Sequence, residues 1–137
     1  MLAPILALIG WTFVMWFWMY ATRIPAMNKA KVDMEEMRRT GKKLELPPEV
    51  ARVADNYNHL HEQPQVFYAI AIVAFVIGRG DDGINLVLAW IYVGLRVAHS
   101  FWQALVNVIA VRFALFATSS LVLIALTIRV AHALLTA

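Results

Sequence analysis

The chain contains no cysteine, and this absence removes several kinds of chemistry. A protein without thiols forms no disulfide, offers no thiolate ligand to a metal and carries no cysteine nucleophile. Any thiol chemistry at this protein would therefore need a thiol that arrives with a substrate.

Charged residues are also scarce, at 15% of 137 residues, whereas 61% are hydrophobic. Ordinary soluble domains contain about 45–50% apolar residues. The composition therefore predicts an integral membrane protein, and the length fits one domain of four spans, since a span needs about 20 apolar residues. The net charge of +3 does not indicate nucleic-acid binding, because the basic residues lie in one mixed-charge segment or singly among apolar ones.

An all-α fold is expected, a membrane four-helix bundle whose first helix covers about residues 2–22. This stretch has no charged residue, and a signal peptide is the alternative, although no basic segment precedes it. Residues 23–47 then form a polar loop of mixed charge. The positive-inside rule places this loop in the cytoplasm and both termini on the opposite side.

The other three helices are expected at about 48–78, 84–106 and 110–133. Pro48 suits a helix start, and Pro64 removes a backbone donor, which predicts a kink beside Glu62. Residues 78–83, GRGDDG, read as a tight turn. Asn107 is a candidate N-cap for the last helix.

Two polar stripes run along the expected second and third helices. At 3.6 residues per turn, Asp55, His59, Glu62 and Val66 share one face of the second helix. Ionisable groups in hydrocarbon cost about 2.5–3.5 kcal/mol each, so this face should point inward. The stripe of the third helix contains Tyr92, Arg96, His99 and Gln103.

Three arginines, Arg52, Arg96 and Arg112, lie near the cytoplasmic ends of three different helices. Guanidinium groups that converge there would bind a small anion with carboxylates, because each presents a planar fork of donors. The alternative is that some of them extend to lipid headgroups.

The sequence leaves three roles open for Glu62. It could pair with Arg96 across helices, grip a substrate ammonium, or exchange protons in a small drug exporter. A metal site is not favoured, because His59 and Glu62 are the only close histidine–carboxylate pair at ligand spacing.

The motifs together resemble the MAPEG family, the membrane-associated proteins of eicosanoid and glutathione metabolism. The similarity covers most of the chain, with Asp55 and His59 standing where the family has arginine and asparagine. The matching residues are His59-x-x-Glu62 followed by Pro64, then Arg96-x-x-His99, then Arg112.

This resemblance implies a homotrimer that binds glutathione between subunits, in a site open to the cytoplasm, and takes a lipophilic second substrate from the bilayer. A glutathione-dependent transferase or peroxidase is the leading hypothesis, and a non-catalytic lipid-binding or scaffold member is the alternative. Arg112 would be the catalytic residue that stabilises the thiolate. The expected glutathione-binding residues are Arg52, His59, Glu62, Arg96, His99 and Gln103.

Overall fold

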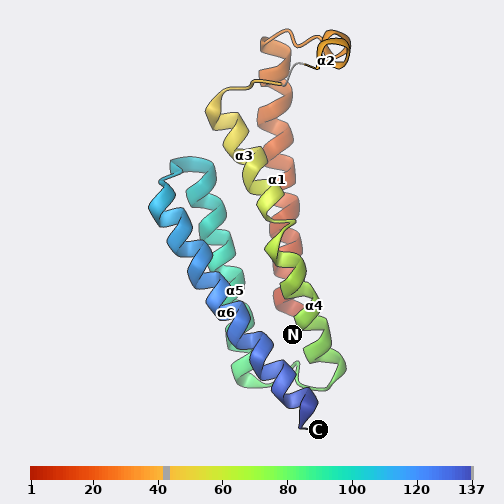
Figure 1. Cartoon of the computed structure of the whole chain (residues 1–137), viewed down its shortest axis with the longest axis vertical. Helices are drawn as coiled ribbons and strands as arrows, with labels where there is room; N and C mark the ends of the chain where they lie inside the picture. Colours follow the sequence, from red (N-terminus) through yellow and green to blue (C-terminus); the bar gives the residue numbers. More distant parts are fainter. Residues whose placement is uncertain (42–43, 137) are drawn as a thin grey trace.

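The computed structural model describes residues 1–41 and 44–136, which are helical and contain no strand (Figure 1). Lys42 and Lys43 of the expected polar loop lie outside the described residues. The helices in chain order are α1 (Leu2–Lys29), α2 (Met34–Thr40), α3 (Pro48–His59), α4 (Gln63–Val76), α5 (Gly83–Phe101), the π-helix η1 (Trp102–Val106) and α6 (Ile109–Leu135).

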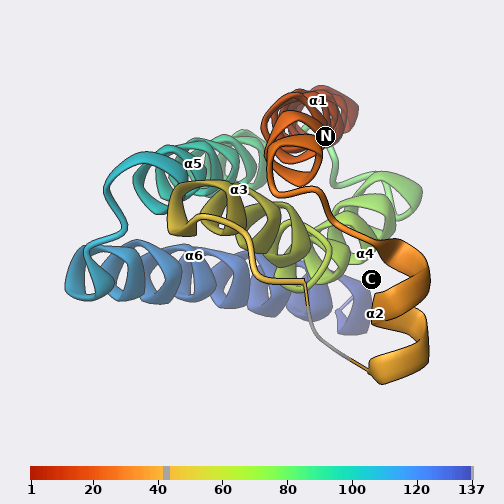
Figure 2. The same ribbon diagram turned by 90° about the horizontal axis from the view of Figure 1, so that it is seen from above.

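Three segments within the described chain are long and apolar enough to cross a membrane: α1, α5 with η1, and α6. Helices α5 and α6 pack along each other, while α1 packs against α3, α4 and α5. Figure 2 shows α1 and α5 on one side of α3 and α6 on the other. The expectation of an all-helical membrane protein is confirmed at this level.

The expected single helix over 48–78 is wrong, because the chain leaves helical geometry between α3 and α4. Bonds from the His61 nitrogen to the Asn58 carbonyl, at 2.9 Å, and from Glu62 to His59, at 3.3 Å, form tight turns there. Pro64 then lies in the first turn of α4, where its missing N–H removes no helical bond. The proline thus starts a new helix beside Glu62 instead of kinking an existing one.

The first helix extends to Lys29, seven residues beyond the expected end, and passes through Pro25. Within the polar segment that follows, the Asp33 carboxylate accepts hydrogen bonds from the backbone N–H groups of Glu35 and Glu36 and caps the short helix α2. Figure 1 places α2 at one end of the molecule.

The third and fourth helices begin close to their expected positions, but their junction differs. The last turn of the third helix widens into η1, closed by a 2.7 Å bond from the Asn107 nitrogen to the Trp102 carbonyl. Asn107 adopts a left-handed conformation, with φ of +57°, and ends this segment. The prediction that Asn107 caps the fourth helix is wrong, since Val108 occupies that position.

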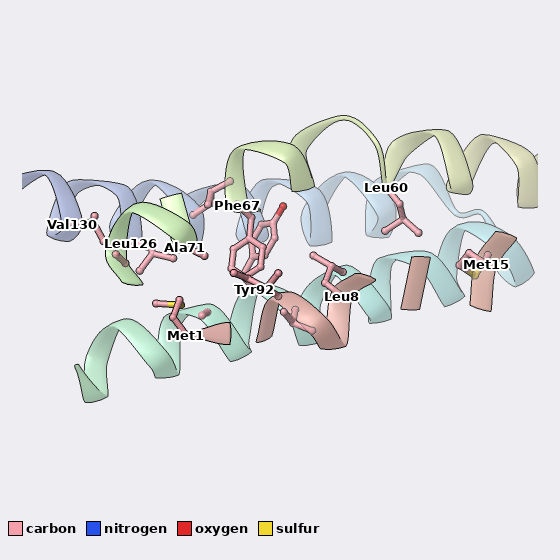
Figure 3. Packing of buried hydrophobic residues seen from close by; sticks show 14 of the residues in the cluster. Met1, Leu8, Met15, Leu60, Phe67, Ala71, Tyr92, Leu126 and Val130 are labelled. Carbon is pink, nitrogen blue, oxygen red and sulfur yellow. The ribbon is translucent and has the colours of Figure 1, made fainter. Parts of the chain in front are cut away.

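The core joins α1, α3, α4, α5 and α6 (Figure 3). The rings of Phe67 and Tyr92 stack with centroids 4.7 Å apart, and both side chains are fully buried. Small buried residues, such as Ala71 and Ala89, let neighbouring helices approach closely. Close packing of this kind stabilises helices in a bilayer, where lipid is as apolar as the side chains themselves.

At the end opposite α2, the turn between α4 and α5 holds the start of α1. The Met1 nitrogen donates to the Gly80 carbonyl at 3.0 Å. A Cβ on Gly80 would lie 3.1 Å from the Cβ of Met1 and 3.1 Å from the backbone Cα of Phe75. The Asp82 carboxylate then caps α5 by accepting from the N–H groups of Ile84 and Asn85.

Replacing Gly80 with alanine is expected to destabilise the protein by about 1–3 kcal/mol, because the added methyl group meets backbone that cannot move aside. Thermal unfolding in detergent measures this loss. Gly94→Ala is the matched control, because no atom lies within 4 Å of a Cβ there. An equal melting temperature for Gly80→Ala and the wild type would show that the turn is looser than these distances indicate.

Candidate functional site

Arg96 is the most deeply buried charged residue of α5, with 1% of its surface exposed. Its Nε donates to the Tyr92 hydroxyl at 3.1 Å, and its Cζ lies 5.0 Å from the ring centroid of Phe116. No carboxylate in residues 1–41 and 44–136 forms an ion pair with it, and Nη2 has no hydrogen-bond partner there. A buried cation without a counter-charge is unfavourable, so a bound anion would stabilise the Arg96 guanidinium.

The hydrogen bond from Arg96 continues across two further helices. The Tyr92 hydroxyl donates to the Gln63 Oε1 at 3.5 Å, and the Gln63 Nε2 donates to the Ser120 Oγ at 2.6 Å. Ser120 in turn donates to the Phe116 carbonyl. This chain ties the start of α4 to α5 and α6, so it fixes the position of Arg96 relative to the α3–α4 break.

Three more polar side chains, on α3, α5 and η1, are buried without partners, and α3 packs against η1. We call Asn56, Arg96, Ser100 and Gln103 the inner polar cluster. Both amide atoms of Asn56 and of Gln103 lack a hydrogen-bond partner among the described residues, as does the Ser100 hydroxyl. Leaving such a group unpaired costs about 1–3 kcal/mol, so these donors and acceptors are available to hydrogen-bond a ligand.

Gln103 lies within the π-helical turn that follows α5. An α-helix advances 100° per residue, whereas the wider η1 turn over Trp102–Val106 changes the direction of the residues that it contains. Gln103 is 1% exposed. Single π-turns within α-helices are frequent at functional sites, so this segment is a candidate part of the site.

His59 and Glu62 form a second, exposed part of the site, at the end of α3. The His59 Nδ1 lies 2.8 Å from the Glu62 Oε2, and these side chains are 37% and 62% exposed. The expected pair between Glu62 and Arg96 is therefore absent from the described residues. The expectation that this stripe faces inward is also wrong for the single chain, since Asp55 and Val66 are exposed as well.

His99 connects the two parts. Its ring centroid lies 6.3 Å from that of His59 and 6.4 Å from that of Phe116. Phe116 also lies beside Arg96, whose Cζ is 5.0 Å from its ring centroid. The structure thus brings His59, His99 and Arg96 into one neighbourhood.

The remaining two arginines hold local contacts. The Arg112 Nη1 donates to the Asn107 Oδ1 at 2.8 Å, which ties its guanidinium to the link between η1 and α6. The Arg52 Nε donates to the Pro48 carbonyl one turn earlier in α3. Arg52 has no recorded contact with the inner polar cluster, and it forms no ion pair with Asp55 in the described chain.

The sequence interpretation missed Asn56, Ser100 and Gln63. Asn56 lies three residues after Val53 and four before Leu60, and these apolar residues are both buried. That spacing is the signal that marks the inward face of α3. Gln63 had no comparable signal, because its direction depends on the break between the two helices.

The amino-acid sequence also matches the model of a known family. The match is to the MAPEG family and covers residues 1–132, nearly the whole chain.

The chain belongs to the MAPEG family.

Neither the curated proteins nor the solved structures contain a match to it. The expected family is therefore confirmed, and the protein is a membrane protein of the MAPEG family with three membrane-capable helices. Within this MAPEG protein, a guanidinium, two amides and a hydroxyl on α3, α5 and η1 are buried with unpartnered atoms, and a histidine–carboxylate pair lies on the outside. Such groups can bind carboxylates, peptide groups and an ammonium at neighbouring points.

Proposed function

We propose that this protein is a glutathione-dependent membrane enzyme, a transferase or peroxidase acting on lipophilic electrophiles or hydroperoxides. The observation that carries the proposal is Arg96, a buried guanidinium with an unpartnered Nη2 and no carboxylate to neutralise it. Glutathione offers two carboxylates, an ammonium, two peptide groups and a thiol. The chain has no thiol of its own, so the reacting sulfur would come from this substrate.

Each group of glutathione would meet a chemically matched group of the site. One carboxylate would approach the Arg96 Nη2, and the amides of Asn56 and Gln103 would bind the peptide groups. Glu62 would hold the ammonium, which opposes its charge. Because Arg96 is almost fully covered, one of the side chains over it must rotate when glutathione enters.

His59, His99 and Arg52 would form the outer wall of this site. His59 already links Glu62 to His99, so it would align the ammonium-binding carboxylate with the interior. Arg52 lies on α3 nearer the α2 end and would meet the second carboxylate after releasing the Pro48 carbonyl.

Arg112 would stabilise the thiolate. A free thiol has a pKa near 8.5, and lowering it by about two units needs about 2.7 kcal/mol of preferential anion stabilisation. One guanidinium in a shielded site can supply this. The thiolate then attacks the electrophile, forming a carbon–sulfur bond as a leaving group departs or as the attacked double bond takes up a proton. With a hydroperoxide it attacks the terminal oxygen and breaks the O–O bond, which gives the alcohol and a glutathione sulfenic acid. A second glutathione then converts this acid to the disulfide and water.

The exposed polar stripe supports assembly into a homotrimer. Glu62 is 62% exposed in the single chain, and Asp55 is exposed as well. An ionisable group facing hydrocarbon is costly, so another subunit or water must cover this face. Glutathione would then lie between subunits, with α3 and α4 together forming the fourth span.

This topology would place the polar segment containing α2 in the cytoplasm and both described ends of the chain on the other side. Seven basic residues between Arg23 and Pro47, counting Lys42 and Lys43, favour that orientation. Cytosolic glutathione would enter from the α2 end, and a lipophilic substrate would enter from the bilayer.

Calorimetry with glutathione and ultraviolet difference spectra of the purified protein test the proposal. We expect saturable binding and a thiolate absorbance near about 240 nm at neutral pH. Absence of both signals would reject the enzyme. Binding of lipid without any thiol turnover would favour the scaffold alternative, and proton-driven uptake of a drug into proteoliposomes would favour the exporter.

A further inference from the structure

The end of the molecule opposite α2 has a cavity of about 410 Å³ that the candidate site does not use. It lies where the α4–α5 turn meets the last turns of α6, at the end where Figure 1 places the C-terminus. The polar side chains that line it are those of Arg79, Asp82, Asn85, Arg129, His132 and Thr136. We call this hollow the end cavity.

The polar groups of the end cavity are held by hydrogen bonds from three segments. The Arg129 Nε donates to the Asn85 Oδ1 at 2.9 Å, and its Nη2 donates to the Asp82 Oδ1 at 3.3 Å. The Asn85 Nδ2 donates to the Arg79 carbonyl at 3.2 Å, and Asn85 is only 2% exposed. A buried amide therefore positions a guanidinium at the rim of the cavity.

The end cavity has an excess of positive charge. The backbone N–H of Asn85 and the charge of Arg129 hold the pKa of the Asp82 carboxyl below its usual range, so this residue stays ionised. It neutralises one of the two arginines. The Arg79 guanidinium has no side-chain partner in residues 1–41 and 44–136, and His132 adds a further donor.

An apolar groove lies next to this cavity, between α4 and α6. The groove, of about 350 Å³, is lined mainly by Val66, Leu123, Ile124, Thr127 and Ile128. Ile128 lines the end cavity as well, so the two hollows adjoin at this residue. The groove also reaches Gln63 and Ser120, which are joined by a hydrogen bond.

We propose that the end cavity and this groove together bind one anionic phospholipid. A cationic pocket at the end of a membrane-crossing helix, continued by an apolar channel toward the membrane interior, matches an amphiphile with a phosphate group and an acyl chain. Arg79 and Arg129 contact the phosphate oxygens, and the chain lies against Ile124 and Ile128. This site goes beyond the proposed enzyme and does not depend on it.

Native mass spectrometry of the full chain, purified and reloaded with phosphatidylglycerol, tests the headgroup contacts. Arg79→Gln is expected to lower lipid retention about tenfold, equivalent to about 1.4 kcal/mol. Arg79 makes no recorded side-chain bond, so this variant should fold normally. Arg23→Gln, the same charge change near the opposite end of α1, is the control. Equal retention in both variants would overturn the proposal.

A second experiment identifies the occupant of the groove. Because the chain has no cysteine, Ile124→Cys carries a single thiol that a benzophenone maleimide can label. In phosphatidylglycerol vesicles, illumination is expected to give mainly a lipid adduct. A cross-link between two chains as the main product would show that a second copy covers the groove, and it would overturn the lipid site. Phosphatidylcholine retained as well as phosphatidylglycerol would reject the requirement for an anionic headgroup.

Discussion

Replacing Arg96 with methionine is expected to raise the melting temperature of the ligand-free protein while weakening glutathione binding about 100-fold. The two effects have one cause. A buried guanidinium without a carboxylate partner destabilises the empty protein, and an apolar side chain of similar length removes that cost. The same guanidinium gives about 3 kcal/mol when a carboxylate pairs with it, and methionine gives none.

Arg129→Met is the matched control for this prediction, because Arg129 already has Asp82 as its partner. It should lower the melting temperature and leave glutathione affinity unchanged. Calorimetry and thermal unfolding on both variants give the four values needed. If Arg96→Met also lowered the melting temperature and kept full affinity, Arg96 would be a structural residue and the proposed site would be wrong.

Replacing Arg112 with alanine is expected to reduce turnover at pH 7 about 25-fold while changing glutathione affinity little. Without the guanidinium, the bound thiol returns from a pKa of about 6.5 to its ordinary value of about 8.5, and its ionised fraction falls from about 75% to about 3%. The carboxylates and ammonium would still be held by other residues. Absorbance near 240 nm and steady-state rates measure these two effects.

The pH profile separates this role from a structural one. Above about pH 9.5 most of the thiol ionises unaided, so the rate of Arg112→Ala should approach that of the wild type. Asn107→Gly is the matched variant, since glycine tolerates the φ of +57° and removes only the oxygen that holds Arg112. It should give an intermediate profile. A constant deficit at every pH would show that Arg112 does not act on the thiol.

The long apolar stretches made α1, α5 and α6 predictable. Each is an apolar run bounded by charged or turn-forming residues, and such runs form helices in a bilayer regardless of how they pack. Periodicity also placed Tyr92, Arg96 and His99 on one buried face of α5. These features depend on local sequence alone.

The geometry around Glu62 was not predictable in the same way. A proline in an apolar run indicates either a kink or a new helix start, and only the turn over residues 60–62 decides between them. The orientation of Asp55 and Glu62 followed from that break. His59, three residues away, pairs with Glu62 locally, whereas Arg96 would have had to reach from another helix.

Gln103 of the inner polar cluster was predicted, because it follows Arg96 and His99 at helical spacing, although the widening over Trp102–Val106 was not expected. Asn56 was missed because the interpretation followed the charge of its neighbour Asp55. In the structure Asp55 is exposed and Asn56 is fully buried.

The interruption between α3 and α4 has a consequence for how a hydrophilic molecule could travel inside a lipid-embedded protein. Each helix end leaves up to four backbone donors or acceptors unsatisfied, and hydrocarbon offers them nothing. A chain that breaks partway along a span must therefore admit solvent molecules to that depth or cover the gap with a neighbour. The first arrangement would give a water-soluble tripeptide a polar path to Glu62 that avoids the hydrocarbon of the bilayer.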